Sequence, residues 1–158
     1  MLCAQFFIDE DRYAISVKDI VEIVPVVILK TIPMLPSYAA GLMNYHGNQV
    51  PVIDLCHLLL NRPCQKKLST RIILVARTGQ LEASMMLGFM VEKATEIITI
   101  DEGLCRPPAM KNPDSPMNGT VVVYQEVLVT KISIEDVFDK LDKRIFHKID
   151  VSVNEITP

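Results

Sequence analysis

The sequence contains no tryptophan, and aromatic residues make up only 6% of its 158 residues. So few rings leave little surface on which the bases of a nucleic acid can stack. Neither sign of charge is in large excess, because the chain has 16 basic and 19 acidic residues and a net charge of −3. Nucleic-acid-binding domains usually carry a basic surplus or a basic face. The composition therefore argues against nucleic acid as a partner.

Long apolar runs are missing as well. No run approaches the about 18 residues of a transmembrane helix. The first residues, MLCAQFFIDEDRYAI, have acids where a signal peptide needs a basic and then an apolar stretch. We therefore expect a cytoplasmic protein without direct membrane insertion. The hydrophobic fraction of 49% is ample for one soluble domain with a buried core.

The usual motifs of catalysis and metal binding are absent too. There is no CxxC, no paired-histidine metal motif, no glycine-rich phosphate loop and no GxSxG. Cysteines 3, 56, 64 and 105 lie far apart, and we predict free thiols. Cys56 precedes His57, but adjacent side chains point in different directions, which leaves a thiol-dependent enzyme as a remote alternative. We expect no catalytic residue, no metal and no cofactor.

The segments that are present are short, strand-like and separated by turn residues. In the first half the pattern predicts strands at 2–9, 13–17, 37–45 and 49–55, a helical turn leading into a strand at 17–24, and a helix at 54–60. In the second half it predicts strands at 71–77 and 84–91, a link at 91–98, a hairpin at 120–132 and a helix at 133–145. Asp54 and Ser133 are the expected N-caps of the two helices.

Turn and linker residues divide these segments. His46-Gly47-Asn48 is a predicted turn, since glycine and asparagine tolerate positive φ. Pro51 cannot donate a ladder hydrogen bond and places the strand 49–55 at an edge or at a bulge. The proline-broken segment 61–69 is a predicted polar linker. Lys66, Lys67 and Arg71 are expected to be solvated there.

The two halves carry the same order of elements. Val17 precedes Glu22 by the same spacing as Val91 precedes Glu96, and Gly41 and Gly119 occupy matching places. The chain is therefore interpreted as two units, about 1–67 and 68–145, with a C-terminal helix and tail at about 134–158. Five strands in each half can close a small β-barrel, and the two barrels share one hydrophobic core. A single sandwich would not need a helix after each hairpin.

The stretches YAISVKDIVEIV and IPMLPSYAAGLMNYHGNQVPVIDL resemble the CheW family of chemotaxis coupling proteins. LGFMVEKATEII matches the family's second-half strand and link, and the resemblance runs from about residue 4 to residue 142. It implies one CheW-like domain over 1–158, mainly β, with two five-stranded SH3-like barrels around a common core and short helices. It also implies a non-enzymatic adaptor. Such adaptors bridge a CheA-type histidine kinase, through its regulatory domain, to the cytoplasmic tips of chemoreceptors in membrane-bound arrays.

The resemblance also assigns residues to partner binding, all in the first barrel. They are Ile20, Glu22, Gly41, Asn44, His46 and Gly47. Three residues depart from the family pattern: Tyr45 stands at a usual leucine, His46 at a usual arginine and Glu92 at a usual aspartate. These departures leave the pathway open among swimming, surface motility and second-messenger control. A CheW-like scaffold or decoy with a single partner is the alternative function.

Overall fold

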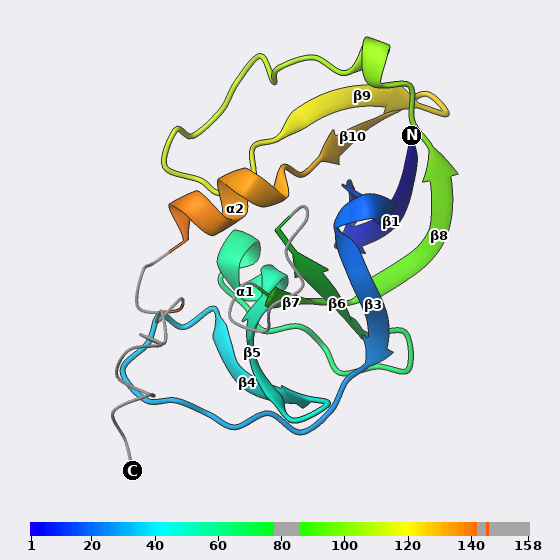
Figure 1. Cartoon of the computed structure of the whole chain (residues 1–158). Coiled ribbons are helices and arrows are strands. Elements are labelled where there is room, and N and C mark those ends of the chain that lie inside the picture. Colours follow the sequence, from blue (N-terminus) through cyan, green and yellow to red (C-terminus); the bar gives the residue numbers. More distant parts are fainter. Residues whose placement is uncertain (78–85, 142–144, 146–158) are drawn as a thin grey trace.

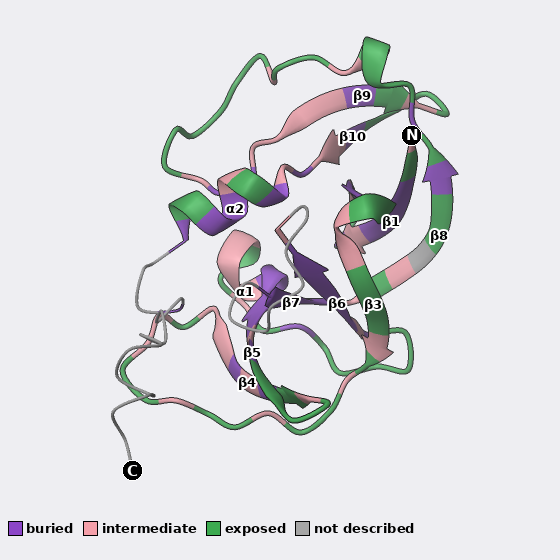
Figure 2. Cartoon of the chain, in the orientation of Figure 1, coloured by how far each residue is buried: buried purple, intermediate pink, exposed green. Residues whose placement is uncertain are grey.

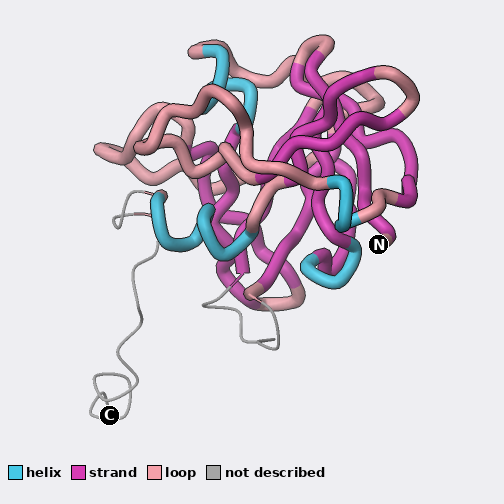
Figure 3. The backbone as a smooth tube through the Cα atoms, turned by 90° about the horizontal axis from the view of Figure 1, so that it is seen from above, coloured by secondary structure: helices cyan, strands magenta, loops and turns pink. Residues whose placement is uncertain are grey.

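The computed structural model describes residues 1–77, 86–141 and 145, which form two five-stranded sheets with short helices (Figure 1). The first sheet has the strand order β8-β1-β2-β10-β9, with bounds Lys93–Thr99, Leu2–Ile8, Asp11–Ser16, Val127–Lys131 and Thr120–Tyr124. The second has the order β3-β6-β7-β5-β4, with bounds Ile20–Pro25, Arg71–Ala76, Met86–Val91, Asn48–Asp54 and Ala39–Tyr45. The predicted mainly β class is confirmed. Seen from above, the short helices and the longest loops lie around the strands (Figure 3).

Each sheet takes strands from both halves of the chain. β1 and β2 join β8, β9 and β10, whereas β6 and β7 join β3, β4 and β5. The reason lies at β2, which already has β1 on one side and β10 on the other. β3 therefore finds no free side there and pairs with β6. The expectation that each half closes a barrel from its own strands was wrong.

The helices begin where the sequence predicts. Helix α1 (Leu55–Leu60) follows β5, and the Asp54 carboxylate accepts a hydrogen bond from the His57 N–H at 3.1 Å. Helix α2 (Ile134–Lys140) follows β10, and the Ser133 hydroxyl accepts from the Asp136 N–H at 3.3 Å. α2 is shorter than predicted because its backbone becomes extended at Leu141.

Two short 3-10 helices also lie in the described part of the chain. The 3-10 helices η1 (Val17–Asp19) and η3 (Glu102–Leu104) lie between strands, and η1 with β3 confirms the predicted turn leading into a strand. The predicted turn at 78–80, the start of the strand at 84 and the tail from 146 fall outside the described residues. In the described part of the chain, no helix combines the length and the apolar composition needed to span a membrane.

Pro51 occupies a strand that is not at the edge of its sheet, contrary to one of the two expectations. β5 lies between β7 and β4. The ladder to β7 spans only Val52–Asp54, however, so at Pro51 the strand has a neighbour on one side alone. A missing N–H costs nothing on that open side. The predicted bulge is not at Pro51 either, because the register shift of this ladder lies in β4, between Ala39 and Gly41 and opposite Val52 and Ile53.

One large hydrophobic core joins the two sheets, as predicted. Phe6 and Ile15 from the first sheet and Ile72 and Phe89 from the second belong to the same buried cluster, and none of the four has exposed surface. Burial is densest in β6 and β7 (Figure 2). A smaller cluster within the first sheet contains Cys3, Ala14, Ile98, Ile100, Val122 and Val129.

The two N-caps give a test of this architecture. Asp54 is only 6% exposed, and its second oxygen accepts from the Cys64 N–H at 2.9 Å. Asp54→Asn keeps one acceptor but turns an NH₂ group toward a backbone N–H, so we expect a loss of about 2 kcal/mol in unfolding free energy. Ser133→Ala, the matched control, should cost about 1 kcal/mol. Urea denaturation measures both, and an equal cost would contradict the double role of Asp54.

Candidate functional site

All six residues assigned to partner binding lie in the second sheet and its hairpin turn. Ile20 and Glu22 belong to β3, and Gly41 and Asn44 belong to β4. His46 and Gly47 form the two-residue turn between β4 and β5. β3 and β4 are the two outer strands in the order of this sheet. Sheet order alone would therefore hold the two groups apart.

Contacts between the two outer strands close this distance. We call this region, formed by Glu22 and Tyr45 together with Lys30 and Leu42, the seam. The Tyr45 hydroxyl donates to the Glu22 carboxylate at 2.6 Å, although the two residues come from opposite outer strands. The chain after β3 adds a second contact, because Lys30 and Leu42 exchange backbone hydrogen bonds of 2.9 and 2.8 Å. The sheet therefore curls until its two outer strands meet. The bond to Glu22 raises the pKa of the Tyr45 phenol, since losing the proton would place two negative charges together.

The hairpin turn presents His46 to solvent. His46 and Gly47 both have positive φ, 51° and 86°, as in the type I′ turn that suits the twist of β-strands. The Asn44 side-chain oxygen accepts from the Gly47 N–H at 2.8 Å and fastens the turn. The His46 ring lies edge-on to the Tyr45 ring, with 4.3 Å between centroids. The turn thus extends the seam with an exposed imidazole.

Gly41 and Ile20 occupy different surroundings from the other four residues. Gly41 is buried at the β4 bulge with φ 143°, and a Cβ there would lie 2.6 Å from the Lys30 carbonyl oxygen. Its absent side chain lets the chain after β3 lie directly against β4. Ile20 is partly buried and packs against the large core. Both residues shape the seam, whereas Glu22, Asn44, His46 and Gly47 are exposed on it.

Apolar residues beside Glu22 extend the seam, and the sequence reasoning did not assign them. Val21 and Ile23 are 39% and 38% exposed. Ile23 lines a hollow of about 210 Å³ together with Ile97 of β8, which is 55% exposed. The signal was present in the sequence, because Glu22-Ile23 and Glu96-Ile97 are the repeated pair of the two link segments.

The thiol of the Cys56–His57 pair, on which the remote enzyme alternative rests, is not at a surface. Cys56 has no exposed side chain, and its sulfur contacts the sulfur of Cys64. The predicted linker 61–69 is a loop in which Lys66 and Lys67 are exposed, as expected. Arg71 is half-buried at the start of β6, so its predicted solvation was wrong in part.

Comparison with known proteins agrees with this geometry. A family model described as CheW-like domain matches residues 3–142. The chain is 26% identical over 136 residues to the chemotaxis protein CheW of Helicobacter pylori, which covers 85% of this chain and 79% of that protein. It is 24% identical over 102 residues to the probable chemotaxis protein CheW of Rhizobium etli, covering 65% and 63%.

A solved structure gives the same result for the fold. The scaffolding protein TtCheW of Thermoanaerobacter tengcongensis superposes with a TM-score of 0.70 and 26% identity, covering 84% of this chain and 83% of that one. This match confirms the predicted SH3-like architecture of two five-stranded sheets and the resemblance on which it rested.

The two glycines of the site differ in their surroundings, because a side chain would meet the backbone at one and open space at the other. Gly41→Ala puts a Cβ 2.6 Å from a backbone oxygen, so we expect a loss of about 2–4 kcal/mol in unfolding free energy. Gly47→Ala has positive φ but meets nothing within 4 Å, so it should cost about 1 kcal/mol. Denaturation followed by circular dichroism compares them. Equal losses would show that the contact with Lys30 does not constrain Gly41.

Proposed function

The chain belongs to the CheW-like domain family, and we propose that it is a non-enzymatic adaptor between chemoreceptors and a CheA-type histidine kinase. It joins membrane-bound receptor arrays from the cytoplasm. It binds the cytoplasmic receptor tip on one face and the regulatory domain of the kinase on another. The observation that carries this proposal is the seam, where β3 and the β4–β5 hairpin bring an exposed carboxylate and an exposed imidazole together, with exposed apolar residues beside the carboxylate in β3.

The chemistry of the seam suits a protein partner. Val21 and Ile23 flank Glu22 along β3, and all three residues are exposed. An apolar centre with a polar rim is the usual anatomy of a protein interface. Tyr45 holds Glu22 through the 2.6 Å bond, so the carboxylate is positioned before a partner arrives. Such preorganisation lowers the entropy lost on binding.

An adaptor needs a second face, and the β9–β10 hairpin supplies one. Val123 and Leu128 are direct cross-strand neighbours, and each is 64% exposed. They lie in the first sheet, whereas the seam lies in the second. Exposed apolar pairs of this kind mark interaction surfaces when they are contiguous. We assign one partner to the seam and the other to this hairpin.

Reconstitution with purified receptor fragments and kinase tests the two faces. Glu22→Lys should weaken one of the two pairwise contacts about tenfold, which is about 1.4 kcal/mol. Leu128→Glu should weaken the other by a similar factor. Leu68→Glu is the matched control, since Leu68 is 96% exposed and lies outside both faces. Binding of a single partner would instead identify a scaffold or decoy, and loss of both contacts in each variant would contradict separate faces.

His46 gives a second test, directed at partner choice. Histidine changes its charge between about pH 5 and 8, whereas arginine stays charged. If His46 faces the partner, affinity should change about fivefold between pH 6 and 8. His46→Arg should remove that dependence and alter which receptor or kinase is preferred. Asn48→Arg adds a cation at an exposed position two residues away but keeps the imidazole, so its pH dependence should persist. A pH-independent native affinity would show that the turn faces solvent in the complex.

A further inference from the structure

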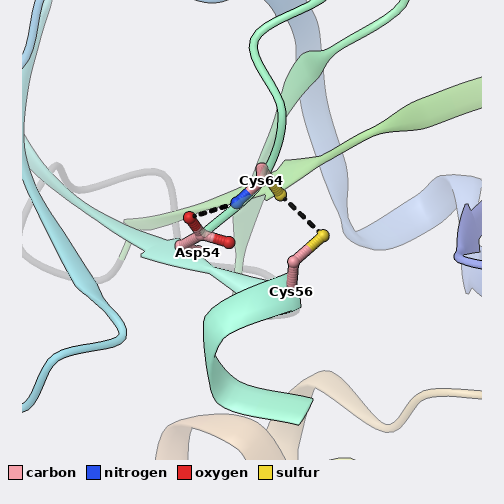
Figure 4. Close-up of side chains that lie close together, drawn as sticks. All are labelled: Asp54, Cys56 and Cys64. Carbon is pink, nitrogen blue, oxygen red and sulfur yellow. Dashed lines mark hydrogen bonds between the residues drawn. The ribbon is translucent and has the colours of Figure 1, made fainter. Parts of the chain in front are cut away.

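Two buried cysteines lie against each other, one in the first turn of helix α1 and the other in the loop that follows it. The sulfur atoms of Cys56 and Cys64 are 2.8 Å apart, and the residues are 0% and 6% exposed (Figure 4). A disulfide bond measures about 2.05 Å, so the two atoms are within about 1 Å of bonding distance. Both residues are free thiols in this structure.

Asp54 holds the two cysteine-bearing segments together. One carboxylate oxygen accepts from the His57 N–H in the first turn of α1, which carries Cys56. The other accepts from the backbone N–H of Cys64 itself (Figure 4). The same buried side chain therefore fixes the backbone on both sides of the thiol pair.

Glu92 fastens the Cys64 loop a second time. It accepts two hydrogen bonds from the Arg62 guanidinium, at 3.0 and 3.1 Å, and one from the Gln65 N–H at 2.7 Å. The Arg62 guanidinium lowers the pKa of Glu92, so the carboxylate stays charged and keeps these bonds. Arg62 and Gln65, on either side of Cys64, are thus both hydrogen-bonded to Glu92. The thiols are preorganised by contacts that do not involve the sulfurs.

The fold does not require a cysteine at this place in the helix. Cys56 is the second residue after the cap Asp54, and the second residue after the matched cap Ser133 is Glu135. Both helices form on the same framework. The thiol pair is therefore a feature of this chain that the duplicated architecture leaves unexplained.

We propose that Cys56 and Cys64 are an oxidation site at which a hydroperoxide forms a reversible disulfide. The two thiols lose two electrons and two protons as the S–S bond forms. The O–O bond of the peroxide breaks and takes up both electrons and both protons, which gives two waters from hydrogen peroxide. The burial of the pair favours an oxidant of this small size over an oxidised protein or peptide.

The oxidation proceeds in two steps, and hydrogen bonding and burial hold the pair protonated before it. Cys64 donates to the Cys56 sulfur, and this bond, burial and the nearby Asp54 carboxylate raise the pKa of Cys64. In the native chain one thiol of the pair attacks the peroxide to give a sulfenic acid and one water. The other sulfur then attacks the sulfenic-acid sulfur, closes the disulfide and releases the second water.

A metal site is the competing use of the same three side chains. Asp54, Cys56 and Cys64 place their ligand atoms within 4.8 Å of one another. Two thiolates on a tetrahedral zinc with bonds of about 2.3 Å lie about 3.7 Å apart, so the sulfurs would have to separate. Both Asp54 oxygens also already accept backbone hydrogen bonds. These observations favour the disulfide.

Peptide mapping of the full chain tests the proposal. The reduced protein is treated with hydrogen peroxide and digested under non-reducing conditions. We expect a Cys56–Cys64 cross-link that a thiol reductant reverses, and a melting temperature about 5 °C higher in the oxidised form. Cys64→Ser should lose the cross-link and leave a sulfenic acid on Cys56, which dimedone labels when the oxidised variant, freed of peroxide, is denatured in its presence. This labelling is a positive readout that a destabilised variant does not imitate, provided that circular dichroism shows it folded.

Cys105→Ser is the matched control. Cys105 is more exposed than either member of the pair, so it would react first if exposure alone governed oxidation. We expect the Cys56–Cys64 cross-link to form unchanged in this variant. Oxidation confined to Cys3 or Cys105 in the native chain would overturn the proposal. So would one zinc per purified chain whose removal by a chelator exposes two thiols.

Discussion

The exchange of β3 and β8 between the two sheets is the constraint on which the rest of the structure depends. β2 and β7 each have neighbours on both sides, so the strand that follows each of them must pair in the other sheet. Neither sheet has its five strands without both halves of the chain, and the large core draws residues from both. The halves of the sequence are therefore not folding units. Stability in one sheet is coupled to stability in the other.

The same exchange builds the seam. Because β3 crosses into the second sheet, it becomes an outer strand there, and Glu22 comes within reach of Tyr45 on the opposite outer strand. Gly41 permits the close approach of the chain that follows β3. The reciprocal crossing of β8 puts Ile97 beside Ile23 in the hollow between the sheets. The exposed surface of the seam thus follows from the way the core is shared, rather than from a local motif.

Asp54 links fold and chemistry in one side chain. As a cap it begins α1, and through the Cys64 N–H it holds the loop that returns beneath that helix. A carboxylate buried to this extent is stable only when its oxygens are hydrogen-bonded, which both are. The free-energy cost of burying this carboxylate is offset by the two hydrogen bonds through which it fixes two backbone segments. One result is a pair of thiols held close enough to react.

The sequence by itself determined those features whose cause is short in range. Period-two patterns located the strands, and the glycine at 47 marked the turn. Asp54 and Ser133 marked the helix starts, and each accepts a hydrogen bond from the N–H three residues further on. The tertiary structure alone decided which strands pair, on which side Pro51 lies open, and that Tyr45 meets Glu22 and Cys56 meets Cys64. The physical reason is that a cap or a turn is satisfied within a few residues. A strand edge or a thiol instead meets a partner that is distant in the sequence. Which partner it meets depends on how the other strands have paired.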